Sequence, residues 1–527
     1  MEEQTDNLPG TATIAVIDIG SNSIRMAVAE TTPDGHHRVL ERTQRAVHLG
    51  QDTFTTGRLS PEAIHAAISI LGDFRRVLET YQVQRIRAVA TSAVREASNA
   101  DTFLDRIYMA CGLDAEVIST SEESRLKVLA VRDALAAAPE IEFHDALAVE
   151  IGGGSALLTI LHGGQIVTSE SYRLGSIRIQ ETLSIRDERP EKAADLIRHQ
   201  MAGTLAAITS SLPLKKIRTF VAVGGDARFA ARQIGRPTAS PKLHVLQAKR
   251  FDRLVGQCEL LSPEQLTRKY GLSHAEAETL VPALLTYQAL VHETAARRVI
   301  VSDTSMRDGV LLDMARGAAG AEDEDLAEGV VQSARAIGEK YRYDAAHAEH
   351  VAEVAVRLFD ELQPEHGLNR RHRLLLRVAA VLHEVGAYVS GRAHHKHSYY
   401  LISNAEVFGL TGEELEVVAQ VARYHRRGSP RPTHIPYISL PREKRMVVSK
   451  LSAVLRVADA LDRGHAQQVQ SFHVERRPGE LVVHIHGAAD LALERRAMAR
   501  KSDLFEDLYG MRVRLEEAPL PAPKGVS

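Results

Sequence analysis

The segment IAVIDIGSNS at residues 14–23 shares its design with a second segment, ALAVEIGGGS at residues 146–155. Each begins with an apolar run that predicts a buried strand, and each carries one carboxylate near the end of that run, Asp18 or Glu150. Gly and Ser follow where the backbone turns, because residues with little or no Cβ let several amide N–H groups converge on an oxyanion. Two such loops facing each other would hold a phosphate chain from both sides, so the pair predicts phosphate chemistry.

Length and composition are typical of a large soluble enzyme. The chain has 527 residues, more than one hydrophobic core organises, which predicts about three or four domains. Charged residues make up 25% and the net charge is −3, so we expect no nucleic-acid or membrane partner. No apolar run reaches the roughly 18 residues of a membrane span, and the polar first ten residues carry no signal-peptide core, so we expect a cytoplasmic protein.

The N-terminal two-thirds has the pattern of two related α/β halves. Strand–turn units begin both halves, which implies an internal duplication with a cleft between them. In the first half we expect strands near 13–19, 25–30, 38–48 and 86–90, with a helix over 61–81; in the second, strands from 146 to 167, at 219–223 and at 298–302, with a helix near 190–210.

Two further segments supply candidate polar groups for this cleft. Residues 91–97, TSAVREA, turn from a strand into a helix whose N-terminus, beside Arg95, suits an anion. Residues 119–126, STSEESRL, begin a helix that should cross from one half to the other. Its acidic residues either complement the helix dipole at the surface or orient and deprotonate a water that attacks phosphorus.

Seven motifs occur in order along the chain: DIGSNS at Asp18, ATSAVREA at Ala90, EESR at Glu122, EIGGGS at Glu150, RLGSIR at Arg173, VGGDAR at Val223 and DTSMRDG at Asp303. Together they resemble the exopolyphosphatase and guanosine pentaphosphate phosphohydrolase family. The resemblance implies an α/β actin-like fold of duplicated ribonuclease-H-like halves, as in sugar kinases and chaperones. It also implies hydrolysis of the terminal phosphate of inorganic polyphosphate or of pppGpp.

The same resemblance implies roles for individual residues. Glu123 matches the catalytic glutamate, and Arg95 would stabilise charge in the transition state. Asp18 and Glu150, the latter where the family commonly has Asp, would hold Mg²⁺. K⁺ and a homodimer are further expectations from the resemblance. The phosphate-binding set is Gly20, Ser21, Asn22, Ser23, Ser92, Arg95, Gly152, Gly153, Gly154 and Ser155.

The second loop departs from the family pattern. Family members often continue it with Thr and Glu, whereas this chain has Ala156 and Leu157. The loss removes a carboxylate usually associated with a second metal, so metal affinity or placement is expected to differ here. An active enzyme is still expected, because Glu123, Asp18 and Glu150 remain.

Beyond the acidic stretch 321–328 the chain is almost entirely helical in pattern. His347, the pair His383 and Glu384, and Asp459 resemble the HD-domain phosphohydrolase scaffold. That scaffold normally has His-Asp where this chain has His-Glu, and the longer side chain is expected to misplace a metal. We therefore expect a vestigial site in a non-catalytic HD-like domain, with His394, His395, His397 and His425 as further candidate ligands.

A cluster of basic residues lies within this helical region. Either it is a solvated face, or it guides the distal part of a long polyanion by salt-sensitive attraction. In the second case chain-length preference resides in the helical domain. The candidate guide residues are Arg423, Arg426, Arg427, Arg431, Lys444 and Arg445.

The expected domains follow from these patterns. A small α+β module should contain strands at 471–476, 480–485 and 512–515 and a helix near 488–507. The expected boundaries are 1–130 and 131–315 for the two actin-like halves, 320–465 for the helical domain, 466–517 for the α+β module and 518–527 for a disordered tail.

Three functions compete at this stage. The leading one is an Mg²⁺-dependent exopolyphosphatase in which Glu123 activates water. The second is pppGpp 5′-phosphohydrolase activity, which needs a guanosine pocket that the sequence does not locate. The third is a sensor that binds polyphosphate or ppGpp without turnover, suggested by the missing Thr-Glu and the altered His-Glu. A kinase is less favoured, because no residues indicate a phosphate acceptor.

Overall fold

The computed structural model describes residues 12–32, 34–139, 141, 145–162, 165–185, 188–318, 324–426, 428–487 and 490–519. The chain divides into two compact units, residues 1–325 and 326–527, which are described separately. Arg427 and residues 520–527 of the expected tail lie outside the described residues.

The first half of unit 1 is built on a five-stranded sheet in the order β3-β2-β1-β4-β5. β1 is antiparallel to β2 and parallel to β4. Its apolar residues are buried on both faces, with Ile14 and Val16 in one core cluster and Ile17 and Ile19 in another, which explains the uninterrupted apolar run. The strands are β1 Ala12–Ile19, β2 Ser23–Thr31, β3 His37–Ala46, β4 Arg85–Ala90 and β5 Ala115–Val117.

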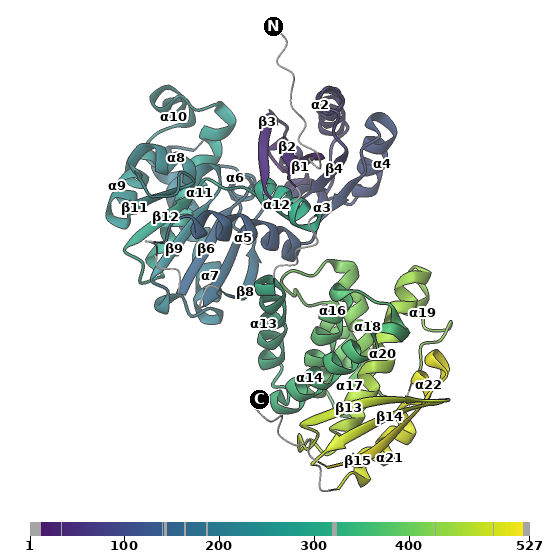
Figure 1. The fold of residues 1–527 in the computed structure, drawn as a ribbon. Coiled ribbons are helices and arrows are strands. Elements are labelled where there is room, and N and C mark those ends of the chain that lie inside the picture. The colour runs from purple at the N-terminus through teal and green to yellow at the C-terminus, as the bar shows by residue number, and fades with distance from the viewer. Residues whose placement is uncertain are drawn as a thin grey trace. The chain divides into compact units, whose positions relative to one another are not determined.

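The second half repeats this arrangement. Its sheet has the order β10-β11-β12-β9-β6-β7-β8, in which β8-β7-β6-β9-β12 matches β3-β2-β1-β4-β5 in order and direction. The duplication predicted from the two glycine turns is therefore present in the topology (Figure 1). The strands are β6 Asp145–Ile151, β7 Ala156–His162, β8 Gln165–Tyr172, β9 Thr219–Val223, β10 Arg236–Pro237, β11 Leu243–Gln247 and β12 Arg298–Ser302.

The helices of unit 1 begin at residues that cap them. Ser119 Oγ accepts a hydrogen bond from Glu122 N at 3.1 Å and so begins α5, which leaves the first sheet. The helices are α1 Leu49–Thr56, α2 Pro61–Thr80, α3 Ser92–Arg95, α4 Ala100–Cys111, α5 Thr120–Ala136, α6 Ser176–Leu183, α7 Pro190–Ser211, the 3₁₀ helix η1 Leu214–Lys216, α8 Gly225–Ile234, α9 Ala248–Cys258, α10 Pro263–Tyr270, α11 His274–His292 and α12 Met306–Ala318.

Helix α12 packs on the sheet of the first half. Its Val310 and Leu311 lie in one core cluster with Ile14 of β1. It also crosses α5 closely, since a Cβ on Gly309 would lie 1.8 Å from Leu126 O. Most of this helix falls within the boundaries expected for the second half, and its apolar face packs on the sheet of the first half.

Unit 2 joins a helical part to a small sheet. The buried helix α20 packs against α14, α16 and α18, and also against α21 and α22 of the C-terminal module. The single helix expected near 488–507 is two helices that meet at Ser502, and β15 extends into the expected tail. The elements are α13 Glu324–Lys340, α14 Ala345–Glu361, α15 Gln363–His366, α16 Arg370–Leu382, the 3₁₀ helix η2 Val385–Tyr388, α17 His394–Ser403, α18 Gly412–Arg423, α19 Ile435–Ile438, α20 Arg442–Leu461, β13 Ser471–Arg477, β14 Glu480–His486, α21 Ala492–Lys501, α22 Asp503–Tyr509 and β15 Arg512–Ala518.

Within the described part of the chain, no helix is both long and apolar enough to cross a membrane.

Candidate functional site

The two glycine loops face each other in unit 1. Both close with the same turn, since Gly20 N donates to Ser23 O at 3.1 Å and Gly152 N donates to Ser155 O at 2.9 Å. A Cβ on Gly153 would lie 3.1 Å from the Cβ of Ser21 in the opposite loop. The absence of a side chain at this contact lets the two backbones approach across the cleft.

The loops line a cavity of about 220 Å³ between the two halves. Of the residues expected to act here, Gly154 and Arg95 do not line it. Those that do are Asp18, Gly20, Ser21, Asn22, Ser23, Ser92, Glu123, Glu150, Gly152, Gly153 and Ser155.

The RLGSIR motif supports the second loop from behind. A Cβ on Gly175 would lie 2.2 Å from the carbonyl carbon of Gly154, so the chain passes against the loop backbone at a point where only glycine fits. Arg178 Nε donates to Gly154 O at 2.6 Å, and its guanidinium pairs with Glu96 at 2.6 Å. Sequence reasoning recognised the motif without identifying this supporting role.

The two neighbouring glutamates at the start of α5 have different surroundings. Glu122 is buried and accepts hydrogen bonds from Arg87 at 3.0 Å and Arg125 at 2.7 Å, an ion-pair network that anchors the helix. Glu123 lines the cavity instead. The structure therefore separates an anchoring carboxylate from one that faces the cleft.

Lys127, which sequence reasoning missed, lies between two of the expected site carboxylates. Its Nζ is 2.6 Å from Glu123 Oε1 and 2.6 Å from Glu150 Oε2. Lys127 follows Glu123 by four residues, about one helical turn, and this spacing could have indicated their contact from the sequence. Glu150 comes from the other half, and no sequence spacing indicates that contact.

The charges in the cleft shift the pKa values of its carboxyl groups in opposite directions. Burial alone would raise the pKa of Glu123, but Lys127 and Arg95 outweigh it and hold the pKa below its usual value. Burial raises the pKa of Asp18 and of Glu150, and in both cases exceeds the opposing effect of neighbouring cations. Glu123 is thus the carboxylate most firmly kept ionised among the three.

Arg95 lies behind Glu123. Its Nη1 is 3.3 Å from Glu123 Oε2 and donates to Ile118 O at 2.8 Å. Helix α3, which was expected to present an anion-binding N-terminus, is only four residues long. These contacts favour a positioning role for Arg95 over direct contact with phosphate.

Other charged residues that line the cavity were not singled out from the sequence. Arg25, on β2, lies 3.8 Å from Asp18, and Arg228 on α8 lies 3.4 Å from Asp303. Enclosure of Asp226 raises the pKa of its carboxyl to about 7, against the opposing charge of Arg228. Arg25 and Arg228 both lie in or beside the glycine motifs, and this position in the sequence could have identified them as cavity residues.

The residues expected to hold Mg²⁺, Asp18 and Glu150, both line the cavity, and Glu150 has a lysine beside it. Lys127 already supplies the positive charge between Glu123 and Glu150. Leu157 lines the cavity on the strand that follows the second loop, where the family commonly has its additional carboxylate nearby. Among the described residues, every group of three side chains with ligand atoms close enough to share an ion lies in unit 2. Asp18 and Glu150 stay the predicted Mg²⁺ ligands, because Mg²⁺ usually keeps several waters and needs only one or two protein carboxylates.

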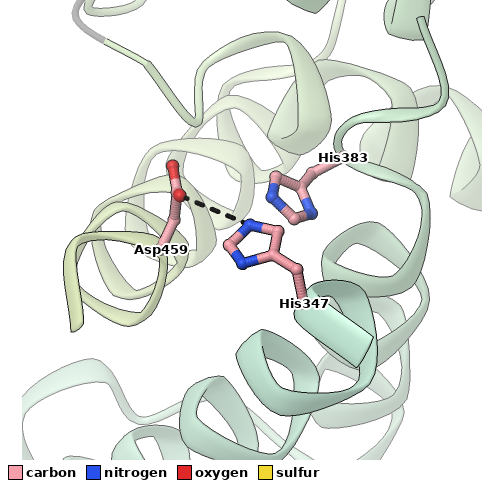
Figure 2. A group of neighbouring side chains, drawn as sticks. All are labelled: His347, His383 and Asp459. Carbon is pink, nitrogen blue, oxygen red and sulfur yellow. Dashed lines mark ion pairs between the residues drawn. The ribbon is translucent and has the colours of Figure 1, made fainter. Parts of the chain in front are cut away.

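Unit 2 brings three of the four expected HD-like residues together. His347 Nε2 lies 3.8 Å from Asp459 Oδ1, and the ring of His383 lies 5.3 Å from that of His347, between centroids (Figure 2). The fourth, Glu384, belongs to two overlapping groups, one with His347 and His465 and one with His394 and His425. Among the described residues, His395 and His397 are in none of these groups.

The expected guide residues lie around the end of α18 and the start of α20. Arg426 and Arg431 are exposed, whereas Lys444 pairs with Glu413. Arg423 stacks over the ring of Tyr399 at 5.1 Å. The cluster is thus partly neutralised, and Arg426 and Arg431 are its most accessible charges among the described residues.

Unit 1 has two topologically equivalent α/β halves, facing glycine loops and an ionised glutamate. These are the features of a two-lobed protein that binds phosphate in its cleft. A sequence profile of the Ppx/GppA phosphatase family matches residues 11–317, and the profile of domain III of that family matches residues 331–498. The chain belongs to the Ppx/GppA phosphatase family, as the seven motifs predicted. This membership supports phosphate-ester or anhydride hydrolysis as the class of reaction.

Solved structures are similar to part of this chain, and two of them, with TM-scores of at least 0.50, support the fold. An exopolyphosphatase from Cytophaga hutchinsonii is 24% identical, with a TM-score of 0.52, over 58% of this chain and 98% of that one. An exopolyphosphatase-like protein is also 24% identical, with a TM-score of 0.50 and the same coverage. The Aquifex aeolicus family member is 25% identical, with a TM-score of 0.48, over 58% of this chain and 97% of that one.

Proposed function

We propose that this protein is an exopolyphosphatase that releases terminal orthophosphate from inorganic polyphosphate in the cleft of unit 1. The observation that carries the proposal is the position of Glu123, an ionised carboxylate that faces a cavity lined by two opposed glycine loops. The name of the Cytophaga hutchinsonii protein and the family assignment support the same substrate class.

In this mechanism the loop amides hold the terminal phosphate and Glu123 orients a water for in-line attack. The water oxygen bonds to phosphorus, the bridging P–O bond breaks, and the shortened chain leaves with that electron pair. The water proton passes to the Glu123 carboxylate. A carboxylate with a lowered pKa suffices, because phosphoryl transfer has a loose transition state that requires positioning more than a strong base.

Lys127 and Arg95 act as positioning residues for Glu123. They fix its two oxygens separately, Oε1 through Lys127 at 2.6 Å and Oε2 through Arg95 at 3.3 Å. Because Lys127 occupies the place between the carboxylates, we propose that divalent cations enter as the counterions of polyphosphate, with Mg²⁺ the expected ion.

One observation favours a second candidate, a polyphosphate sensor without turnover. The Lys127 bridge and the apolar Ala156 and Leu157 leave the cleft with less free negative charge than the family pattern implies. Such a cleft would bind polyanions well. pppGpp is an alternative substrate for the enzyme, and the cavity residues do not distinguish pppGpp from polyphosphate.

The test measures orthophosphate release with Mg²⁺ from long polyphosphate, tripolyphosphate and pppGpp, without any acceptor, for the wild type and Glu123→Gln. We expect release from long polyphosphate to fall by about 100-fold or more in the variant, because the loss of general-base positioning has effects of this size. Glu62→Gln on α2 serves as a matched control, since Glu62 is an exposed first-turn glutamate of another helix.

The outcomes separate the candidates. Release from pppGpp alone would make the guanosine pentaphosphate the substrate. Tight polyphosphate binding by the wild type without release would favour the sensor. Full activity of Glu123→Gln would exclude the proposed role of this residue.

A further inference from the structure

Three histidines lie on one face of the small sheet in unit 2. His473 is on β13, whereas His484 and His486 are two residues apart on β14. The two strands are antiparallel, and His473 is directly opposite His484. Because successive side chains of a strand point to opposite faces, the three imidazoles share one face, and the buried Phe472 and Ile485 lie on the other.

Two of these rings bring ring nitrogens together. His473 Nδ1 is 2.9 Å from His486 Nε2, and the two rings are stacked with 5.0 Å between their centroids. His473 is exposed and His486 is half-buried. An ion in solution can therefore reach this pair without any opening of the sheet.

A backbone oxygen fixes the direction of the lone pair on His486. His486 Nδ1 is 2.7 Å from the carbonyl oxygen of Pro519, the residue that follows β15. Because a carbonyl oxygen only accepts, Nδ1 carries the hydrogen, and the neutral ring presents the lone pair of Nε2 to His473. Histidines that bind metals are held in this way by a partner on the opposite nitrogen.

His484 restrains the ring of His473. Their rings are stacked with 4.7 Å between centroids and an angle of 13° between planes. His484 Nε2 is itself held at 2.7 Å from Glu475 Oε2. The bond to Glu475 restrains the ring of His484, and the stacked ring of His473 is restrained in turn. Less side-chain freedom is then lost when the pair binds an ion.

The separation of the two nitrogens indicates which ions fit. Neighbouring ligands of a square-planar or tetragonal ion at about 2.0 Å lie about 2.8 Å apart, whereas those of a tetrahedral ion at about the same distance lie about 3.3 Å apart. The separation of 2.9 Å between His473 Nδ1 and His486 Nε2 is close to the first value. Imidazole nitrogens in that geometry suit Cu²⁺ and Ni²⁺.

We propose that His473 and His486 form a binding site for one divalent transition-metal ion of tetragonal preference, with Cu²⁺ as the probe. The ion takes the place of the hydrogen that His473 Nδ1 donates to His486 Nε2, and it bonds to both nitrogens. His473 then carries its hydrogen on Nε2, through exchange with solvent, so both rings stay neutral. Water completes the coordination, because the pair lies on an exposed face of the sheet.

The experiment titrates Cu²⁺ into the untagged full-length protein, first stripped with a chelator, and follows binding by calorimetry. The electron paramagnetic resonance spectrum of the bound ion should show coupling to two imidazole nitrogens. His473→Gln and His486→Gln should each weaken this binding by about tenfold or more and remove one coupling. Loss of a ligand should cost at least as much as loss of an outer-shell partner, which lowers affinity by about 10- to 100-fold.

His199→Gln is the matched control. His199 is exposed on α7, and its Nδ1 is 2.9 Å from the backbone oxygen of Asp195, the same kind of contact that His486 makes. This variant should bind Cu²⁺ as the wild type does, since His199 has no second imidazole bonded to it in the described structure.

His383→Gln separates the sheet site from the buried histidines of unit 2, and it should keep the two-nitrogen spectrum. Loss of that spectrum in His383→Gln but not in His486→Gln would overturn the proposal. Wild-type affinity in both sheet variants, or a stripped wild type that binds no Cu²⁺, would overturn it as well. Phosphate release by unit 1 is measured separately, and its failure leaves this result unaffected.

Discussion

Glu122 and Glu123 are adjacent in sequence and have different surroundings in the structure. Glu122 is enclosed by two guanidinium groups, from Arg87 and Arg125, whereas Glu123 faces the cleft and shares its charge with Lys127. A helix rotates its direction by about 100° per residue, so one residue separates an anchoring position from a cleft-facing one. The assignment of the catalytic role to Glu123 therefore depends on which residues of α5 face the cleft.

Lys127 should contribute strongly to the stability of unit 1. Lys127→Met leaves the half-buried Glu123 and Glu150 without their shared cation, so we expect a loss of about 2 kcal/mol, less than the roughly 3–5 kcal/mol of a fully buried pair. Thermal unfolding should show that the variant loses more free energy of unfolding at pH 8 than at pH 5. At the lower pH, protonation removes charge from the unpaired carboxylates.

Lys192→Met is the control for Lys127. Lys192 pairs with Glu188 at the same four-residue spacing, but its side chain is 62% exposed. Its loss should cost less than about 0.5 kcal/mol. Equal effects of the two substitutions would show that the buried bridge does not stabilise the cleft.

Asp226 should make stability depend on pH. Enclosure raises the pKa of its carboxyl from 3.8 to about 7, so between these values the folded state binds more protons than the unfolded state. The free energy of unfolding then falls as pH rises through this window. At pH 8 we expect Asp226→Asn to be more stable than the wild type by about 2 kcal/mol, roughly half the full shift because the side chain keeps some solvent contact.

Calorimetric melting at pH 4 and pH 8 tests this expectation. The gain should be small at pH 4, where the carboxyl is mostly protonated in the folded state. Asp101→Asn, at an exposed position on α4, should show no comparable difference between the two pH values. A gain in Asp226→Asn that is independent of pH would contradict the assignment.

At the scale of elements, the cleft depends on close backbone approaches. The chain before α6 passes against the second loop at Gly175, and α12 crosses α5 at Gly309. Both positions have room only for a hydrogen atom, and neighbouring backbone cannot move aside as a flexible side chain can. These glycines explain why two of the motifs outside the phosphate loops contain one.

Gly175→Ala should distort the second loop. Its Cβ would lie 2.2 Å from backbone atoms of Gly154, and such overpacking costs about 2–3 kcal/mol. We expect a lower melting temperature together with weaker tripolyphosphate binding, measured by calorimetry.

Gly203→Ala is the control for Gly175→Ala. Gly203 is an exposed position within α7, and the methyl group that alanine would add there meets no neighbouring atom within 4 Å. Alanine should therefore stabilise the protein by about 1 kcal/mol through helix propensity. Unchanged phosphate binding in Gly175→Ala would show that the close approach does not shape the loop.

At the scale of the whole molecule, we propose that the basic cluster of unit 2 affects chain-length preference. If Arg426 contacts the distal part of a long substrate, Arg426→Glu should raise KM for long polyphosphate by about threefold to tenfold and leave tripolyphosphate unchanged. The difference should shrink as salt rises, because such contacts release counterions.

Arg512→Glu is the charge-matched control for Arg426. Arg512 is exposed on β15, outside the cluster. Equal changes in KM for both substrates, or the same change in both variants, would show that Arg426 does not guide long chains.

The local pattern of the sequence was enough to determine the order of elements in unit 1 and the family. The strands at 219–223 and 298–302 coincide with β9 and β12, and the glycine turns predicted the duplicated topology. These features follow from hydrophobic periodicity and from backbone freedom at glycine, which act over a few neighbouring residues.

Only the tertiary structure decided which charges share the cleft and which side chains share the buried cluster of unit 2. Lys127 meets Glu150 from another sheet, and His347, His383 and Asp459 come together from three segments far apart in the chain. Helix α12 also packs on the sheet of the first half, far from it in sequence. Such contacts depend on burial and on the three-dimensional path of the chain, and since electrostatic energy depends on distance in space, sequence spacing does not specify it.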